Sequence, residues 1–297
     1  MNMVIALICL EAALLFFCGR IFRKSNNKNC ENFRASNSGK IGVYLINLDR
    51  ARERLDFVTP QILALDFPIN RISAVDGSSL SSEEIESITD LKTYKRIFKT
   101  HPEVGTIGCS LSHEKTWRAF LESDNEFAII FEDDVQFSPA KLREVIESTI
   151  EQKSLWDIVN FETKHWGCPV EISKVCHGRL VLYLTNVTHA GCYMINRRAA
   201  HRLLQKFYPI KMPLDHYFTS AWEFGLKFAG VEPRMVFQKF GNSQIKMPSD
   251  RKTKTISATN IIYNIQRAIL HFGYNLLRLI IQKRFKSRLS RFSYRIR

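Results

Sequence analysis

FAIIFEDDVQF, residues 127–137, places apolar residues directly before three consecutive carboxylates, those of Glu132, Asp133 and Asp134. The apolar run has the length and composition of a buried strand. Three adjacent carboxylates at the end of such a strand repel one another, so keeping them ionised near a core is costly unless a cation or strong donors compensate. The stretch therefore indicates a strand whose end carries a charged site.

A divalent metal ion would provide that compensation. Mg²⁺ and Mn²⁺ prefer one or two protein carboxylates, with phosphate oxygens and water completing the octahedron. Side chains alternate along an extended backbone, so Glu132 and Asp134 face one way as metal ligands, and Asp133 faces the other way, toward a sugar hydroxyl. Taken without the rest of the chain, an acidic run at a strand end is also typical of a solvated turn.

Strands and helices alternate around this stretch. Such alternation predicts an α/β fold with a mostly parallel sheet covered on both faces, and ligands of open α/β sheets bind beyond the carboxyl ends of the strands. Asp49 follows the first strand and therefore lies at the same edge. We expect strands at 41–48, 69–77, 127–131 and 156–161, and helices at 51–65 with a break at Pro60, at 110–123 and at 138–152.

The charge of the chain is unevenly distributed. The 297 residues carry a formal net charge of +14, but residues 251–297 hold 12 Lys and Arg and no Asp or Glu, which leaves 31 basic and 29 acidic side chains before them. The body is therefore near neutral, and the tail is the cation. With 45% hydrophobic residues the chain can bury a full core, which excludes a disordered protein.

The amino-terminal end is strongly apolar. Residues 3–18 are apolar except for Glu11, and at about 1.5 Å per residue they reach roughly 24 Å, a little short of a bilayer core of ~30 Å. Basic residues follow this segment rather than precede it, which favours a membrane anchor at 1–22 with the body in the cytoplasm. A signal peptide is the alternative. A polar linker follows at 23–40.

The tail at 251–297 contains a predicted amphipathic helix at 261–282. A basic helix of this kind suits the surface of an anionic membrane. The alternatives are docking of the apolar stripe on the protein's own core and, third, binding to nucleic acid. The apolar stripe is Ile262, Ile265, Ile269, Phe272, Leu276 and Leu279, and the remaining face holds Asn264, Arg267, His271, Asn275 and Arg278.

The seven cysteines show no close pairs of the kind that make a disulfide framework, so free thiols in a reducing compartment are expected. A zinc site would have to combine His165, Cys168, Cys176 and His177. This spacing matches no common zinc motif, and buried thiols with surface imidazoles are the favoured interpretation.

Eight segments, in order along the chain, resemble glycosyltransferase family 25, which includes bacterial lipooligosaccharide galactosyltransferases and animal collagen galactosyltransferases. The resemblance covers about 41–247 and implies a GT-A type, Rossmann-like fold with UDP-galactose or a related UDP-sugar as donor. A catalytic domain is therefore expected at 41–250. The segments are VYLINLDRARERLDFV (43–58), ISAVDG (72–77), VGTIGCSLSHEKTWRAFL (104–121), AIIFEDDV (128–135), WDIVNF (156–161), THAGCYMINRRAAHRLL (188–204), MPLDHYF (212–218) and NSQI (242–245).

The resemblance also implies roles for particular positions. One strand end would lie under the nucleotide, a helix start would line the same crevice, and the acidic tripeptide would serve metal and sugar nucleotide. The positions are Asn47, Asp49 and Arg50 for the strand end, Gly108, Ser112 and His113 for the crevice, and Glu132, Asp133 and Asp134 for the acidic motif.

Departure of a UDP-sugar's leaving group places negative charge on the β-phosphate. A metal ion held by the acidic motif would neutralise that charge. Arg50, or alternatively Arg52 or Arg54, is expected to pair with phosphate in a forked geometry. For Arg52 and Arg54 a solvated helix face beside Glu53 is the favoured interpretation, so they are assigned to it.

The acceptor hydroxyl needs a general base if the transfer proceeds with inversion, as the resemblance suggests. Asp215 is the first candidate, and His113 and Glu162 are the alternatives. Asp215 also stands where it would cap the helix that begins near His216, which is a purely structural role.

These features together predict a membrane-associated, metal-dependent glycosyltransferase that moves a hexose from a UDP-sugar to a lipid-linked glycan such as lipooligosaccharide core. The charge bias and the family predict a place at the cytoplasmic face of a bacterial inner membrane, with no nucleic-acid partner. A metal-dependent phosphoesterase is one alternative, disfavoured because the eight histidines do not cluster with acids. A non-catalytic, membrane-bound interaction protein is the other.

Overall fold

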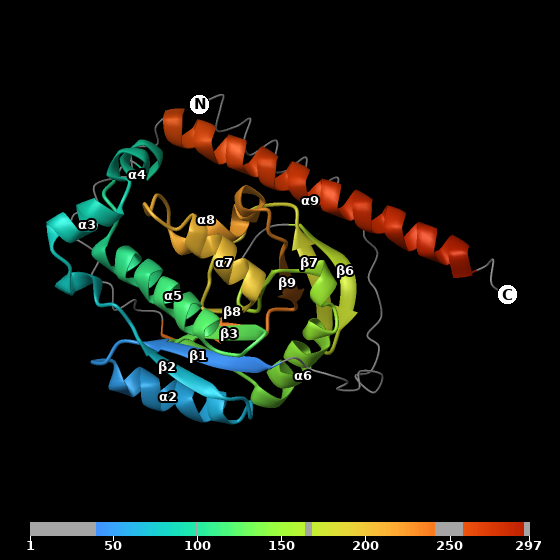
Figure 1. Ribbon diagram of the computed structural model, residues 1–297, viewed down its shortest axis with the longest axis horizontal. Coiled ribbons are helices and arrows are strands. Elements are labelled where there is room, and N and C mark those ends of the chain that lie inside the picture. Colours follow the sequence, from blue (N-terminus) through green and yellow to red (C-terminus); the bar gives the residue numbers. More distant parts are fainter. Residues whose placement is uncertain (1–39, 99, 164–167, 241–257, 294–297) are drawn as a thin grey trace.

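The computed structural model describes residues 40–98, 100–163, 168–240 and 258–293. An eight-stranded sheet forms its centre, with helices on both sides (Figure 1). Across the sheet the strands are β2 (Ile69–Ser73), β1 (Ile41–Asn47), β3 (Phe127–Glu132), β8 (Cys192–Asn196), β5 (Ile158–Asn160), β9 (Phe228–Glu232), β7 (Gly178–Tyr183) and β6 (Pro169–Val175).

Most strands of this sheet run in one direction. β1 is parallel to both β2 and β3, and β5 is parallel to β9. β8 is antiparallel to β3 and β5, and β7 is antiparallel to β9 and β6, so six strands share one direction and β7 and β8 oppose them. The expected α/β fold with a mostly parallel sheet is confirmed, with β8 as an antiparallel insertion at its centre.

Two hydrophobic layers cover the sheet. α2 (Arg52–Leu63) and α6 (Pro139–Ile150) pack on one face, and α5 (Val104–Glu122), α7 (Arg197–Gln205) and α8 (Leu214–Thr219) pack on the other (Figure 1). Successive side chains of β1 alternate between these layers, since Val43 and Leu45 join the first core and Tyr44 and Ile46 the second. Trp117 on α5 is fully buried, as its helical spacing predicts.

Smaller elements complete the fold. α3 (Ser82–Ile88) begins with a capping box between Ser81 and Glu84, and α4 (Leu91–Phe98) follows it. β4 (Val135–Phe137) and β10 (Val236–Gln238) form a separate antiparallel pair next to the acidic tripeptide. The expected break at Pro60 is wrong, because α2 continues through it. The proline lies close to the end of the helix, so few backbone hydrogen bonds are lost.

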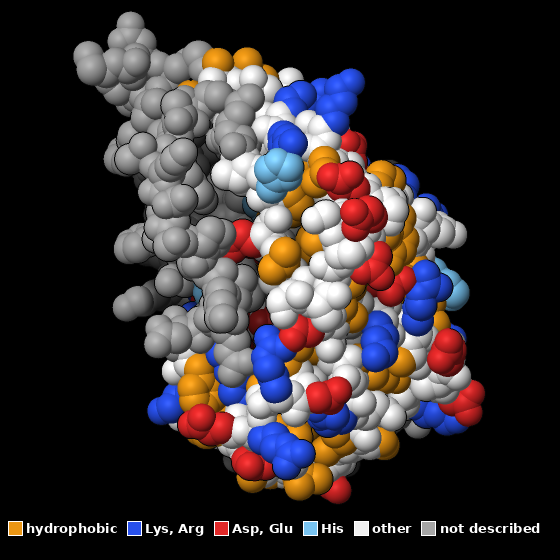
Figure 2. Space-filling view, turned by 90° about the vertical axis from the view of Figure 1, so that its left-hand side faces the viewer, with side chains coloured by type: hydrophobic (Ala, Val, Ile, Leu, Met, Phe, Trp, Pro, Cys, Tyr) orange, Lys and Arg blue, Asp and Glu red, His pale blue; other side chains and the backbone are white. Residues whose placement is uncertain are grey.

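Charges of both signs are interspersed on the surface of the body. On the face shown in Figure 2, Lys and Arg side chains lie among Asp and Glu rather than in a patch of one sign. This distribution agrees with the near-neutral charge of residues 1–250 and offers no basic stripe for nucleic acid on that face.

The carboxyl-terminal helix, α9 (Ala258–Ser293), lies across one end of the molecule (Figure 1). Its polar face packs inward: Arg267, His271 and Asn275 are buried, whereas Ile269 and Leu276 are 56% and 40% exposed. The expected helix is confirmed. Of its predicted apolar stripe, Ile262, Ile269 and Leu276 are exposed, whereas Phe272 and Leu279 pack against the core. The inner surface of the helix thus combines the polar stripe with these two side chains.

The predicted anchor at 1–22 and the linker up to residue 39 lie outside the described residues. Within the described residues, no helix combines the length and apolarity needed to span a bilayer.

The cysteines differ from expectation at one position. Cys168 takes part in a disulfide, whereas Cys109, Cys176 and Cys192 are free. The prediction of free thiols is therefore wrong for Cys168, and the argument for a reducing compartment loses its support, because disulfides persist in oxidising ones. Cysteines far apart in the sequence carry no spacing signal, which is why the pairing was not expected.

Candidate functional site

The site is built on the carboxyl ends of three adjacent parallel strands. In the register of the sheet Asn47 at the end of β1 lies beside Ser73 at the end of β2, and Glu132 at the end of β3 lies beside Ile46. Parallel pairing therefore brings together residues that are 86 positions apart in the sequence, such as Ile46 and Glu132. The predicted placement of the acidic tripeptide at a strand-end crevice is borne out by this register.

Asp133 is held rigidly by two donors. Asn47 Nδ2 donates to Asp133 Oδ2 over 2.7 Å, and Arg54 Nη1 donates to Oδ1 over 3.1 Å. The carboxylate is buried, so these charge-assisted bonds compensate its lost hydration. The assignment of Arg54 to a solvated face is wrong, because α2 starts beside the strand ends and its side chain turns inward, leaving 12% of it exposed. Arg52 is exposed, as expected.

Asp134 is buried with weaker compensation. Gln238 Nε2 on β10 donates to Asp134 Oδ2 over 2.9 Å, and Arg54 Nη1 lies 3.8 Å from the same oxygen. Burial and the charge of Glu132 raise the pKa of Asp134 to about 6, against the lowering effect of Gln238 and Arg54. Of the three acidic side chains, Asp134 would gain most from a further cation, because a nearby positive charge would stabilise its ionised form.

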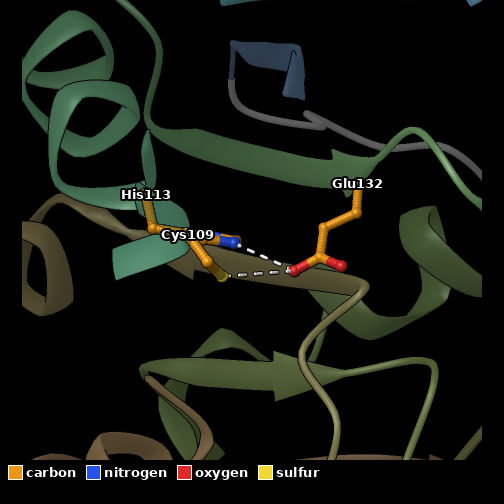
Figure 3. Close-up of side chains that lie close together, drawn as sticks. All are labelled: Cys109, His113 and Glu132. Carbon is orange, nitrogen blue, oxygen red and sulfur yellow. Dashed lines mark hydrogen bonds and ion pairs between the residues drawn. The ribbon is translucent and has the colours of Figure 1, made fainter. Parts of the chain in front are cut away.

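Glu132 faces two side chains of α5 (Figure 3). His113 Nε2 lies 3.3 Å and Cys109 Sγ 3.8 Å from Glu132 Oε1. Burial raises the pKa of Glu132, but the hydrogen bond and charge of His113 outweigh it and lower that pKa below its usual value. The other ring nitrogen, Nδ1, lies 2.8 Å from the hydroxyl of Tyr193, which also accepts from the indole of Trp117 over 2.9 Å. The imidazole is thus fixed in orientation.

Cys109, His113 and Glu132 have the geometry of a metal site. Their ligand atoms all lie within 4.8 Å of one another, and Cys109 and His113 are one helical turn apart. Ligands of a tetrahedral ion at ~2.0–2.3 Å lie roughly 3.3–3.8 Å from each other. The distances of His113 and Cys109 from Glu132, 3.3 and 3.8 Å, fall in this range. Asp134, predicted as a metal ligand with Glu132, does not belong to this group.

Gly108 and Ser112 position the loop that follows β2. A Cβ on Gly108 would lie 2.6 Å from the backbone nitrogen of Gly77, so the helix and loop pack without room for a side chain. Ser112 Oγ accepts from the backbone N–H of Val75 over 2.8 Å and donates to the carbonyl of Gly108 over 2.7 Å. Gly108 therefore lies behind the crevice, while Ser112 lines it.

A cavity of about 640 Å³ opens at these strand ends. Arg50 stands at its edge, half exposed and paired with Asp76 on the loop after β2. Asp49 is outside the cavity lining, with its carboxylate held by Ser73 Oγ at 2.7 Å and Arg71 Nη2 at 2.6 Å, bonds that lower its pKa. The cavity brings together the predicted residues Asn47, Arg50, Ser112, His113, Glu132, Asp133 and Asp134.

Asp215 lies in the first turn of α8 and does not line that cavity. Burial raises its pKa, and Arg267 of α9 and the backbone amides of His216 and His189 lower it in part. Burial, followed by the charges of Glu132 and Asp215, raises the pKa of the Cys109 thiol, which lines the cavity. The charge of Asp215 is therefore felt at the cavity wall.

Glu162, the other carboxylate considered as a base, is already engaged. Its Oε1 lies 3.0 Å from His189 Nδ1, its Oε2 accepts from the N–H of Gly191 over 3.2 Å, and the side chain is buried. His189 has a φ of 76°, a left-handed conformation that a non-glycine residue adopts at a cost. These partners assign Glu162 to holding the segment before β8.

Three residues of the site region have no role that the sequence predicts, and a fourth, Arg54, was assigned to a solvated face instead. Each of the four contacts an element distant in the chain, which no local pattern reveals. The three are Arg71, Gln238 and His189.

Comparison with known proteins places the described geometry in context. The family model described as glycosyltransferase family 25 (LPS biosynthesis protein) matches residues 40–218. Procollagen galactosyltransferase 2 of Mus musculus is 24% identical over 235 residues, which are 72% of this chain and 37% of the relative. Inactive glycosyltransferase 25 family member 3 of Mus musculus is 24% identical over 232 residues, 72% of this chain and 39% of the relative. The chain thus spans less than two fifths of the length of these relatives.

Among solved structures, mannosyltransferase PcManGT from Pyrobaculum calidifontis, in complex with GDP-Man and Mn²⁺, superposes with a TM-score of 0.45. It is 9% identical, and the match covers 82% of this chain and 70% of that one. A likeness of this size says nothing about donor or metal in the present chain.

Proposed function

Because this chain belongs to glycosyltransferase family 25, we propose that it transfers a hexose, galactose in the first place, from a UDP-sugar to a lipid-linked glycan such as lipooligosaccharide core. The observation that carries the proposal is the cavity at the ends of β1, β2 and β3, with buried carboxylates in its wall. Its volume falls within the ~300–1,000 Å³ of small-molecule sites. Galactose is favoured because galactosyltransferases are among the similar proteins.

The donor set fits a divalent ion. Asp134 offers buried carboxylate oxygens and Glu132 partly exposed ones, and the charge of Glu132 raises the pKa of Asp134 after burial does. His113 and Cys109 offer nitrogen and sulfur beside Glu132. Glu132 and Asp134 would hold Mn²⁺ or Mg²⁺, because hard ions prefer oxygen. When bound, the ion would neutralise the charge that develops on the departing diphosphate.

The chain's own residues then bind and orient the donor. Asp133, fixed by Asn47 and Arg54, would accept a hydrogen bond from a sugar or ribose hydroxyl. Arg50 would exchange its partner Asp76 for a phosphate, since a half-exposed guanidinium loses little on that exchange.

Asp215 remains the proposed general base for an inverting transfer. His113 has both ring nitrogens engaged, and Glu162 is tied to His189 and Gly191. Burial raises the pKa of Asp215, which makes its ionised form a stronger proton acceptor than an exposed aspartate. The acceptor would enter from the α8 side, since Asp215 lies in the first turn of that helix.

A second candidate function is a non-catalytic interaction protein. One specific observation favours it: a relative described as inactive is as similar to this chain as one described as a galactosyltransferase. The buried acidic site with intact donors argues for activity, and turnover decides between the two.

The test is to incubate the full chain with Mn²⁺ and a panel of UDP-sugars, and to measure UDP release with and without acceptor glycan. We expect release with one UDP-hexose, increased by acceptor. UDP binding without any turnover would favour the non-catalytic protein, and phosphate release from simple esters would favour a phosphoesterase.

A further inference from the structure

α9 is attached to the protein by its polar face. The ring nitrogens of His271 lie 2.8 Å from the carbonyl oxygens of Thr219 and Tyr183. Arg278 donates to the carbonyls of Phe228 and Leu155 over 2.7 and 3.0 Å. Thr219 and Tyr183 end α8 and β7, and Phe228 begins β9. Carbonyls at such ends need donors, which an apolar stripe would not provide.

The opposite face of α9 is apolar and exposed. Of the eleven large apolar side chains that are exposed in the described part of the chain, seven belong to α9, each between 40% and 56% exposed. Their spacing of three, four and seven repeats the helical period, so they form one continuous stripe. They are Ile262, Ile269, Leu270, Leu276, Leu277, Ile280 and Ile281.

The stripe leads directly into a basic segment. Residues 283–297 contain seven Lys and Arg and no acidic residue, and residues 251–297 hold 12 basic residues without an acid. The exposed stripe extends over 20 residues, or roughly 30 Å of helix. An apolar face in line with excess positive charge matches a surface that combines an apolar interior with negative headgroups.

We propose that the apolar stripe of α9, together with the basic residues at 283–297, docks the catalytic domain on an anionic lipid bilayer. The helix lies in the plane of the interface. This contact requires no rearrangement, because the polar face that holds α9 on the domain is the one that faces away from the lipid. The docking does not depend on the proposed reaction. Only its consequence does, namely that α8, which Arg267 of α9 contacts at Thr219, presents Asp215 to lipid-linked acceptors.

The charge of the segment favours lipid over the other occupants. A second copy would place one tail with 12 basic and no acidic residues against another, which costs free energy unless anions intervene. The apolar residues 3–18 of the same chain would cover the stripe but leave the basic residues without a partner.

The test uses the full chain and vesicles of phosphatidylcholine with or without phosphatidylglycerol. Flotation should show stronger binding to the anionic vesicles, weakened by salt. The fourfold variant Ile262→Gln, Ile269→Gln, Leu276→Gln and Ile280→Gln keeps the inward contacts and should lower binding by at least about tenfold. Unchanged binding by this variant would overturn the proposal.

A second readout separates α9 from any other apolar segment. Leu277→Trp places a reporter on the stripe, and brominated phosphatidylglycerol should quench its added fluorescence. If the brominated lipid does not quench the added fluorescence, the stripe does not contact the bilayer and the proposal is overturned. This holds whether a second copy or another segment covers the stripe. A vesicle-free shift from dimer to monomer in the fourfold variant would assign the stripe to a second copy instead. Leu63→Gln, at a 61% exposed leucine on α2, is the matched control and should bind as the parent chain does.

Discussion

Asn47 Nδ2 donates to Asp133 Oδ2 over 2.7 Å, which ties the end of β1 to the acidic turn after β3. The same amide accepts from Arg71 through its oxygen, with Nη2 at 2.8 Å and Nε at 3.1 Å. Asn47 is 1% exposed, so its amide satisfies a carboxylate and a guanidinium at the centre of the site without water. Asn47 therefore orients the acidic turn after β3, in addition to the position under a nucleotide that the family resemblance implies.

Removing this amide should therefore cost stability and donor binding together. Asn47→Ala removes one of the two donors of Asp133, which keeps Arg54, and one of the two acceptors of Arg71, which keeps Asp49. We expect the free energy of unfolding to fall by about 1–3 kcal/mol, because the lost amide is buried. Chemical denaturation checks this value, and UDP titration checks the binding. Asp49→Asn, at an exposed carboxylate outside the cavity lining, should change the free energy of unfolding much less. Equal effects of the two variants would contradict the role of Asn47.

Arg54 and Arg52 offer a matched pair on one helix. Arg54→Gln removes a donor from Asp133 and positive charge from beside Asp134, so stability should fall by about 1–3 kcal/mol and the pKa of Asp134 should rise. Arg52→Gln changes an exposed side chain and should stay within about 0.5 kcal/mol. Carboxyl titration by NMR with denaturation measures both effects. Similar values for the two arginines would contradict the inward role of Arg54 and would support its assignment to the solvated face of α2.

His216 should make stability depend on pH. Burial, with the charge of Arg267 beside it, lowers the pKa of His216 to about 3, whereas the unfolded chain has the ordinary value of 6.5. Between these values the unfolded state binds more protons, so this contribution to stability is present above pH 6.5 and is lost as pH falls. From pH 7 to pH 5 the loss should be about 2 kcal/mol. His216→Asn should remove this part of the slope, and His201→Asn, at an exposed position, should leave it. An unchanged slope in His216→Asn would contradict the assignment.

Asp215→Asn should separate chemistry from binding. If Asp215 is the general base, kcat should fall by about 10²–10⁴-fold while UDP affinity stays the same, because the side chain does not line the donor cavity. Since the pKa of Asp215 is raised, the parent enzyme should also lose kcat toward acid pH as the carboxylate is protonated. Initial rates over a pH series measure both. A variant with near-normal kcat would leave Asp215 with a structural role in α8.

The sequence determined the centre of the fold well, because β1 and β3 are apolar throughout and parallel pairing then brings their ends together. It could not place Gln238 beside Asp134, since 104 residues separate them and a polar residue in a short edge strand carries no signal of its partner. The prediction for Arg54 was wrong for a related reason. The helical period shows which residues share a face of α2, but it does not show that this face meets the carboxylate of Asp133.

The orientation of α9 shows the same limit more clearly. Periodicity predicted the helix and its polar face, but it put Phe272 and Leu279, which pack inward, on one stripe with the exposed Ile269 and Leu276. The inward choice depends on carbonyls at the ends of other elements, those of Tyr183, Thr219 and Phe228. These carbonyls belong to other elements, so the sequence of the helix alone does not show that its polar face supplies their donors.

Calorimetric titration of UDP into the full chain, with Mn²⁺ and then with chelator, tests whether the strand-end carboxylates hold a divalent ion against a sugar diphosphate. We expect binding to need Mn²⁺, to weaken at least about tenfold in Asp134→Asn, and to change little in Cys109→Ser, because a thiol is a poor ligand for a hard ion. UDP binding that is indifferent to chelator and to Asp134→Asn would contradict the account.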